Sequence, residues 1–339
     1  MNAAPWIARQ TEQLLAQRGH AWLLQGPSGL GQYDLALALA SAWLCEQPTA
    51  QGACGQCPSC HAIAVRTHAD LAVLMPETQM LALGWPLTEK AQADIDDKKR
   101  KPSKEIRVEA MRDVVEFAQR TDARGRGKVV LVYPAERMNA VTANALLKTL
   151  EEPPGDVRFV LATEAAYQLL PTIRSRCQTH TLAWPEPAVA MAWLATQSVD
   201  APVAEALLRS AGGRPSDVMR QSEAGLSPAW WAQLPKAMQQ GDASHLSDLS
   251  PAQAIDALQK LCHDLVLRSI GAEPRFFMAS QLPACQAPVM ALTDWFKRLM
   301  QSARTAEHPF NAGLMLEALA NDAQQALMSR ASSRDVARA

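Results

Sequence analysis

The chain has 339 residues, of which 48% are hydrophobic and 20% are charged. This length suits two or three domains of roughly 100–200 residues each, and the composition excludes a disordered or a fibrous protein. Because 33 basic residues stand against 34 acidic ones, the net charge of -1 argues against a protein that binds nucleic acid alone. The start lacks a basic segment followed by an apolar one, and no stretch offers about 18 uncharged apolar residues for a membrane span. We therefore expect a cytoplasmic protein without membrane contact.

Up to about residue 181, short apolar runs alternate with longer helical patterns, which is typical of a parallel sheet covered by helices. The runs are nearly continuous in apolar or β-branched residues, as buried parallel strands are. Five strands are predicted, at residues 21–24, 71–75, 129–133, 158–162 and 179–182. Helices are predicted at residues 34–43, 108–119 and 138–150. The fold class of this part is therefore α/β.

Residues 84–104 carry many charges and show no period, so we expect an exposed loop there. The basic run Lys98, Lys99, Arg100 and Lys101 lies within it. We interpret this run as part of a solvated insertion, and a contact with DNA or a partner protein is the alternative.

After Trp184 the pattern changes, and a proline-rich linker at residues 184–187 precedes a region that is helical throughout. Helices are predicted at residues 188–198, 201–211, 215–224, 228–240, 251–271, 286–304 and 310–329. The polar residues 330–339 are expected to fray. Two of these helices carry apolar stripes, one with Leu261, Leu265 and Leu267 and the other with Trp295, Leu299 and Met300. We expect both stripes to pack into the core, and an interface with another subunit is the alternative.

A glycine-rich turn follows the first predicted strand and precedes a helix, which is the setting of a phosphate-binding loop. Its glycines are Gly26, Gly29 and Gly31. Gln32 stands where a lysine would reach the phosphates, and Tyr33 where a Ser/Thr hydroxyl would hold Mg²⁺. We therefore expect a degenerate loop that does not bind ATP productively.

The residues that follow the strand at 129–133 also indicate that ATP is not bound productively. In an active nucleotide hydrolase an acidic pair after this strand holds Mg²⁺, but Tyr133 and Pro134 stand there. Glu136 is a replacement acid only if the backbone turns back past the proline. The alternative for both segments is an ordinary turn after a strand, unrelated to nucleotides.

Four of the seven cysteines lie within sixteen positions of one another. They are Cys45, Cys54, Cys57 and Cys60. In a reducing compartment this spacing indicates a metal site, and four sulfur ligands in Cys-x-x-Cys steps favour a structural Zn²⁺ without an open position for water. His61 and His68 are the alternatives to Cys45 as the fourth ligand. A zinc deaminase is disfavoured because no His-x-Glu element lies near the cluster.

Three later segments closely resemble bacterial clamp-loader subunits of the AAA+ class. They are residues 144–154 (NALLKTLEEPP), 159–163 (FVLAT) and 173–177 (IRSRC). The ATPases of this family keep Lys and Thr in the phosphate loop and an Asp-Glu pair after the later strand, and this chain departs at all four positions. The resemblance is specific over residues 1 to about 180 and includes the cysteine module at residues 45–60.

The resemblance implies an AAA+ sheet of the P-loop type, with an inserted zinc module, at residues 1–184. A small helical lid at residues 185–226, an all-α collar at residues 227–330 and a tail at residues 331–339 would follow. In the lid, the turn that begins at Gly212 resembles a sensor turn in which Ser216 replaces the phosphate-binding arginine and Arg214 is a substitute. Thr163 takes the place of the first sensor residue.

The resemblance also implies a role for Arg176, which lies between Ser175 and Cys177 just before the last predicted strand. A planar, permanently charged guanidinium suits an arginine finger that acts on ATP held by a neighbouring subunit. Arg174 is the alternative finger, and an arginine paired to a surface carboxylate is the ordinary interpretation of Arg176.

We therefore expect a non-hydrolysing stator of a clamp loader. The implied partners are gamma/tau-type ATPase subunits and a delta subunit in a hetero-pentamer, which would load a sliding clamp onto primed DNA in the replisome. The alternatives are an autonomous P-loop ATPase, which Gln32 and Tyr33 argue against, and a zinc-dependent nucleic-acid binder acting alone, which the net charge argues against.

Overall fold

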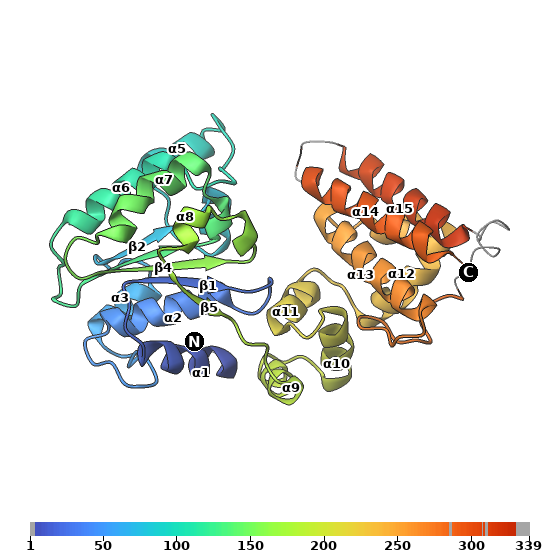
Figure 1. Ribbon diagram of the computed structural model, residues 1–339, viewed down its shortest axis with the longest axis horizontal. Helices are drawn as coiled ribbons and strands as arrows, with labels where there is room; N and C mark the ends of the chain where they lie inside the picture. Colours follow the sequence, from blue (N-terminus) through green and yellow to red (C-terminus); the bar gives the residue numbers. More distant parts are fainter. Residues whose placement is uncertain (1–3, 285–286, 307, 309–310, 330–339) are drawn as a thin grey trace. The chain divides into compact units, whose positions relative to one another are not determined.

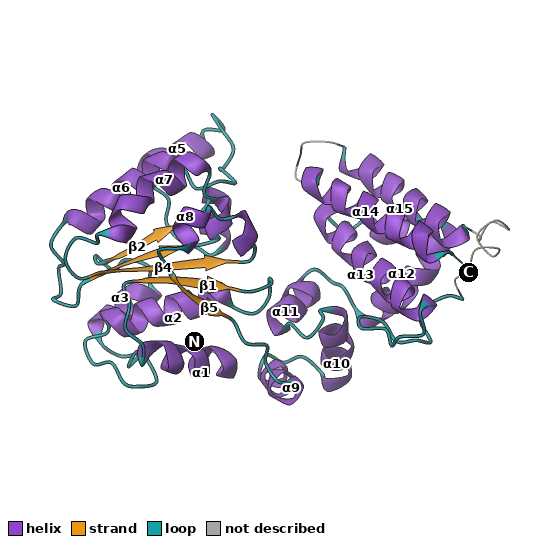
Figure 2. Ribbon diagram, viewed as in Figure 1, coloured by secondary structure: helices purple, strands orange, loops and turns teal. Residues whose placement is uncertain are grey.

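The computed structural model describes residues 4–284, 287–306, 308 and 311–329 (Figure 1). The chain forms two compact units, Met1–Val189 and Ala190–Ala339. The first is an α/β unit and the second is helical (Figure 2). None of the helices in the described ranges is both long enough and apolar enough to span a bilayer.

The first unit is built on a sheet of five parallel strands in the order β2-β3-β4-β1-β5. The strands are β1 (Ala21–Gln25), β2 (Leu71–Leu74), β3 (Lys128–Val132), β4 (Val157–Thr163) and β5 (Gln178–Thr181). All five predicted strands are confirmed. Leu23 pairs with Leu161 on one side and Thr179 on the other, so β1 lies between β4, the central strand, and β5. The edge strands of the sheet are therefore β2 and β5.

Helices cover both faces of this sheet (Figure 1). The helices of the first unit are α1 (Pro5–Leu15), α2 (Gln32–Leu44), α3 (Pro58–Ala64), α4 (Glu77–Ala82), α5 (Glu89–Asp96), α6 (Val108–Gln119), α7 (Ala140–Glu151) and α8 (Pro171–Arg174), with short 3₁₀ turns at Ala135–Arg137 and Ala166–Gln168. Those predicted at residues 34–43, 108–119 and 138–150 are confirmed to within two residues at each end. Helix α1 was not predicted; Pro5 stands at its start, and it buries Trp6 and Ile7.

The expectation of an exposed loop over residues 84–104 is wrong. Helix α5 lies within this segment, and the side chain of Thr88 caps it by accepting a hydrogen bond from the Ala91 N–H. Trp85 is 7% exposed. The guanidinium of Arg100 is paired with the carboxylate of Glu77. Capping and ion pairing thus order a segment whose composition resembles that of a loop.

The second unit consists of helices packed around one continuous core. They are α9 (Pro187–Thr196), α10 (Ala201–Ser210), α11 (Pro215–Glu223), α12 (Pro228–Gln240), a 3₁₀ turn (Ala243–Leu246), α13 (Pro251–Ser269), α14 (Val289–Thr305) and α15 (Ala312–Met328). The predicted helices are confirmed within the described residues; residues 286 and 310, where two were expected to begin, and the tail 330–339 lie outside them. The division into lid and collar stays a prediction.

Core packing accounts for most of the apolar stripes in this unit. Leu261, Leu265, Trp295 and Leu299 are each at most 1% exposed, whereas Met300 is 50% exposed. The buried carboxylate of Asp264 fastens the segment after α13, because it accepts hydrogen bonds from the N–H groups of residues 275–277. This carboxylate therefore satisfies backbone donors that would otherwise be buried without a partner.

Candidate functional site

The glycine-rich turn lies between β1 and α2, as a phosphate-binding loop does. Gly31 caps the helix in the left-handed conformation, with φ of 93°. This positive φ favours glycine, and a Cβ here would in addition lie 2.9 Å from Cδ1 of Ile7 in α1. The indole of Trp6 donates a hydrogen bond to the carbonyl of Leu30, which fastens α1 to the same turn.

The side chain of Gln32 closes this turn on itself. Its amide nitrogen donates hydrogen bonds of 2.7 Å to the carbonyl oxygens of Gly26 and Pro27. Gln32 is only 2% exposed, so these bonds are shielded from water. The position that carries the phosphate-binding lysine in active loops therefore holds a neutral group whose donors are already used within the chain.

Aromatic side chains occupy the two positions at which Mg²⁺ ligands would stand. The hydroxyl of Tyr33 accepts a hydrogen bond of 2.7 Å from the indole of Trp85, and its ring centroid lies 5.5 Å from that of Tyr133. Burial raises the pKa of Tyr33, and so it stays a neutral phenol. Tyr133 in turn donates a hydrogen bond of 3.1 Å to the carboxylate of Glu164. The cluster offers no carboxylate at either position.

Glu136 and Thr163, two residues singled out from the sequence, are brought together. The Thr163 hydroxyl donates a hydrogen bond of 2.6 Å to one carboxylate oxygen of Glu136, and the N–H of Glu164 donates to the other at 3.1 Å. Both oxygens of Glu136 are thus engaged by the end of β4. This carboxylate braces the chain rather than standing free as a replacement acid.

The four predicted cysteines gather into one cluster, with their sulfur atoms all within 4.8 Å of one another. The Sγ–Sγ distances are 3.8 Å for Cys45 and Cys57, 3.9 Å for Cys54 and Cys60, and 3.7 Å for Cys45 and Cys60. Four sulfurs placed about 2.3 Å from a tetrahedral zinc ion lie about 3.8 Å apart. The cluster therefore has the dimensions of a metal site with four sulfur ligands, and Cys45 is its fourth member.

Backbone donors in this module point at the sulfurs. The N–H of Cys54 donates to Sγ of Cys45 at 3.3 Å, and the N–H of Cys60 donates to Sγ of Cys57 at 3.4 Å. Burial alone would raise the pKa of Cys57, but hydrogen bonds from the backbone of Cys60 and Glu46 outweigh it and lower the pKa to about 6. At Cys57 these donors favour the thiolate, which is the form that binds metal, whereas burial raises the pKa of Cys45 and raises the pKa of Cys60 to about 12.

Neither histidine joins the cluster. His61 is exposed, and His68 is buried, where its Nδ1 accepts a hydrogen bond of 3.1 Å from the N–H of Asp70. Burial lowers the pKa of His68, so its ring is neutral near pH 7.

An ion network that sequence reasoning missed joins the cysteine module to the sheet. The carboxylate of Glu46, next to Cys45, accepts hydrogen bonds from Ser59 and Arg124. The N–H of Arg124 and the ammonium of Lys128 both donate to the buried carboxylate of Asp70. The one signal available in the sequence was a charged residue at the head of two apolar strands, since Asp70 precedes β2 and Lys128 begins β3.

Arg176 lies just before β5, and its guanidinium is paired within the chain. It donates two hydrogen bonds to Oε2 of Glu151, at 3.1 and 3.3 Å, and one to the carbonyl of Thr172, at 3.1 Å. Glu151 ends α7 and was not singled out from the sequence. Arg174 is exposed. The neighbouring thiol of Cys177 packs into the core, and burial raises its pKa to about 12.

The predicted sensor turn lies in the helical unit, between α10 and α11. Arg214 donates to a carboxylate oxygen of Asp217 at 2.6 Å and to the carbonyl of Ala211 at 2.9 Å. Ser216, at the position of the phosphate-binding arginine, is half-buried in the first turn of α11. The guanidinium of Arg214 thus serves the structure of the turn.

Comparisons with known proteins show which family the chain belongs to. A family model described as "DNA polymerase III, delta subunit" matches residues 7–186. The DNA polymerase III delta' subunit of Pseudomonas aeruginosa is 40% identical over 220 residues, which cover 64% of this chain and 60% of that protein. The delta' subunit of Escherichia coli is 38% identical over 220 residues, which cover 62% of this chain and 59% of that protein. The matched part thus spans about three fifths of these relatives.

The tau subunit of DNA polymerase III from Escherichia coli is 35% identical over 158 residues, covering 47% of this chain and 20% of that protein. Among solved structures, a gamma subunit-related protein of Thermotoga maritima matches with a TM-score of 0.47 and 15% identity, covering 94% of this chain and 99% of that one. The family model extends over more than half of the 339 residues. The chain therefore belongs to the family of DNA polymerase III delta' subunits.

Proposed function

We propose that this chain is a non-hydrolysing delta' subunit of a DNA polymerase III clamp loader. It acts as a stator and donates Arg176 to ATP bound by a neighbouring subunit, so that the complex loads a sliding clamp onto primed DNA. The observation that carries this proposal is that the side-chain amide of Gln32 donates its hydrogen bonds to the carbonyls of Gly26 and Pro27.

The stator role follows from what the loop lacks. A triphosphate needs a cation at its β and γ phosphates and a Mg²⁺ ion held by side-chain oxygens. Gln32 and Tyr33 supply neither, and the aromatic contact between Tyr33 and Tyr133 fills the space beside them. A subunit of this kind contributes shape and contacts, and its chemical contribution is made at another subunit's site.

The finger role of Arg176 is supported by energetics. Its pair with Glu151 is partly open to solvent, with side chains 31% and 59% exposed, and such pairs contribute only about 0–1 kcal/mol. An arginine finger lowers a phosphoryl-transfer barrier by about 4–7 kcal/mol, corresponding to roughly 10³–10⁵ in rate. Breaking the pair with Glu151 therefore costs much less than an arginine finger contributes to the transition state.

The cysteine cluster is proposed to hold a structural zinc ion. Its four sulfurs fit a tetrahedral ion, and they leave no ligand position for water. The ion would hold the module between α2 and α3 together, and it would take no part in the reaction.

The assembly partners follow from the family. We propose gamma/tau-type ATPase subunits and a delta subunit as the other members of a hetero-pentamer in the cytoplasmic replisome. The 35% identity to a tau subunit over 158 residues supports the proposal that the α/β unit has the same fold as the ATPase subunits beside it in the ring. Residues 185–226 are proposed as the lid and residues 227–330 as the collar that packs with the other subunits.

The decisive experiment reconstitutes the loader with Arg176→Ala, and Arg174→Ala is the matched control two residues away. DNA-stimulated ATP hydrolysis and clamp loading are measured after gel filtration has verified assembly. We expect Arg176→Ala to slow clamp loading by at least about tenfold, and Arg174→Ala to leave it unchanged. Equal activity of the Arg176→Ala loader would overturn the finger assignment.

The stator assignment has a separate test. A fluorescent ATP analogue with Mg²⁺ is titrated into the isolated chain, and we expect no saturable binding up to millimolar nucleotide. Micromolar binding would contradict the proposal and favour an autonomous P-loop ATPase.

A further inference from the structure

A pocket of about 400 Å³ lies beside the edge strand β2. Its walls come from the carboxyl end of β2 and from α4, α5 and α6, so it is built by the segment that joins β2 to α6. Val73, Met80 and Leu87 line it and are only half-buried. The pocket falls within the range of about 300–1,000 Å³ that is typical of ligand sites, and its floor is apolar.

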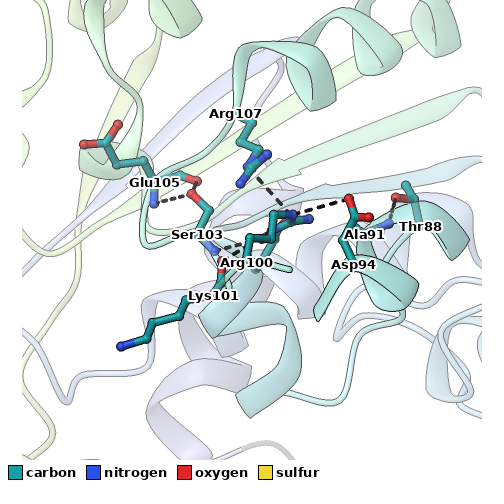
Figure 3. Close-up of polar contacts among 9 residues, drawn as sticks. Thr88, Ala91, Asp94, Arg100, Lys101, Ser103, Glu105 and Arg107 are labelled. Carbon is teal, nitrogen blue, oxygen red and sulfur yellow. Dashed lines mark hydrogen bonds and ion pairs between the residues drawn. The ribbon is translucent and has the colours of Figure 1, made fainter. Parts of the chain in front are cut away.

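Ion pairs hold these walls in place. The carboxylate of Glu77 accepts hydrogen bonds of 2.5 and 2.8 Å from Arg100 and one of 2.8 Å from the N–H of Ser103. Arg107 lies 3.8 Å from the same carboxylate, and Arg100 lies 3.7 Å from Asp94 in α5 (Figure 3). The pocket is therefore shaped before any occupant arrives, which lowers the entropy lost on binding.

The remaining charges on the rim are mostly negative. Glu105, Glu109 and Asp113 all line the pocket, and their spacing of four residues places the last two on one face of α6. All three are exposed, and none forms an ion pair with another described residue. In Figure 3 the carboxylate of Glu105 points away from the other labelled side chains. Lys90 is the one exposed cation of the lining that has no ion pair within the described ranges.

We propose that this pocket binds a short segment of a partner protein in which a large apolar side chain is flanked by lysine or arginine. The apolar side chain fills the space above Val73, Met80 and Leu87, and the flanking cations meet Glu109 and Asp113. Three free carboxylates against one free ammonium group favour a basic segment over an acidic one. This site is separate from the phosphate loop and from Arg176, so it goes beyond the proposed function.

Nucleic acid is a poorer occupant of this surface. Lys99 is paired with Asp97 at 2.9 Å, and the ammonium group of Lys101 points away from the ion-paired group in Figure 3. A phosphate backbone at the pocket would face the carboxylates of α6, which repel it. Binding of DNA at this pocket would therefore contradict the proposal.

The test uses the full chain and defined peptides. The probe is the amide of acetyl-Lys-Lys-Leu-Phe-Lys-Lys; the controls are the same peptide with glutamates in place of the lysines, and with two serines in place of Leu-Phe. Binding is followed by methyl NMR at Val73, Leu87 and Val114. We expect saturable shifts of these methyl groups with the probe, and binding at least about tenfold weaker for either control peptide.

Variants on the exposed face of α6 locate the site without disturbing the core. Glu109→Lys combined with Asp113→Lys should weaken probe binding by about tenfold. Glu116→Lys, the same change on the same helix but outside the lining, should leave it unchanged. Ala110→Phe, which fills the pocket, should abolish the methyl shifts while circular dichroism verifies folding.

Three results would overturn the proposal. They are no saturable binding of the probe up to millimolar concentration, equal binding of the glutamate peptide, and shifts that avoid the lining residues. Shifts of the same methyl groups by a single-stranded oligonucleotide, and not by the probe, would identify nucleic acid as the occupant instead.

Discussion

Arg176 and Glu151 form an ion pair within one chain, with 3.1 Å between a guanidinium nitrogen and the carboxylate. The guanidinium that we assign to a neighbour's ATP is thus held, in this subunit, by the residue that ends α7. A permanently charged side chain gains order from such a pair, while the exposure of both partners keeps the pair weak. The pairing therefore orders the arginine only weakly, and the pair is easily broken.

Removing Glu151 should release Arg176 without harming the loader. We expect Glu151→Ala to change the free energy of unfolding of the isolated chain by less than about 1 kcal/mol. Reconstituted loaders that contain this variant should hydrolyse ATP at the normal rate or faster, because Arg176 no longer has to break its ion pair with Glu151 before it can reach a phosphate. A Glu151→Ala loader as slow as the Arg176→Ala loader would mean that the pair itself is needed.

Restoring the missing lysine should not restore an ATPase. Gln32→Lys removes two hydrogen bonds and places a cation where the side chain is 2% exposed. We expect a loss of about 1–3 kcal/mol in the free energy of unfolding, measured by urea denaturation. No ATP hydrolysis should appear, since Tyr33, Tyr133 and Pro134 still replace the Mg²⁺-binding residues. Hydrolysis by this single variant would contradict our account of the loop.

Removing the metal should lower stability and leave the neighbour's chemistry largely intact. Protein purified without chelators should contain one zinc per chain by atomic emission, and Cys57→Ser should lose most of it. The variant should unfold at lower urea concentration, because metal binding contributes to the folding free energy. Ser59→Ala, a change within the same module outside the ligand set, is the matched control. Zinc content unaffected by Cys57→Ser would contradict the four-sulfur site.

The lowered pKa of Glu77 should make the free energy of unfolding decrease in acid. Burial alone would raise its pKa, but the hydrogen bonds from Arg100 and from the N–H of Ser103 outweigh it and hold the pKa below its ordinary value. A carboxyl group with a lowered pKa stabilises the fold above its unfolded value, and this contribution is lost as the pH falls through the folded value. Urea midpoints should therefore fall from pH 5 to pH 3 more steeply for wild type than for Glu77→Gln. Parallel profiles would contradict this assignment.

Sequence reasoning performed best where the signal was local. Continuous apolar runs identify the strands of the sheet, and two Cys-x-x-Cys steps identify the cysteine cluster, because spacing along the chain fixes both. Even Cys45, nine positions before Cys54, joins as predicted. The degenerate loop was also readable, since the residues that should bind phosphate and Mg²⁺ occupy fixed positions after a strand.

Contacts between segments that are far apart in the sequence could not be predicted from local sequence patterns. Tyr33 and Trp85 are 52 positions apart, and Glu46 and Arg124 are 78 apart, so no period or spacing links either pair. Helix α5 was missed for another reason: it has eight residues, none of them buried, and its charges resemble those of a loop. The pocket beside β2 was unreadable because its floor and walls come from four elements.

The closure of the phosphate loop by Gln32 bears on how the subunit responds to the energy state of the cell. A loop that needs ATP to become ordered changes shape each time the nucleotide binds, is cleaved or leaves. Here the chain's own amide holds two of the loop carbonyls, those of Gly26 and Pro27, without any nucleotide. In the stator role that we propose, this subunit should therefore keep one conformation at any ratio of ATP to ADP while the ATPase subunits change theirs.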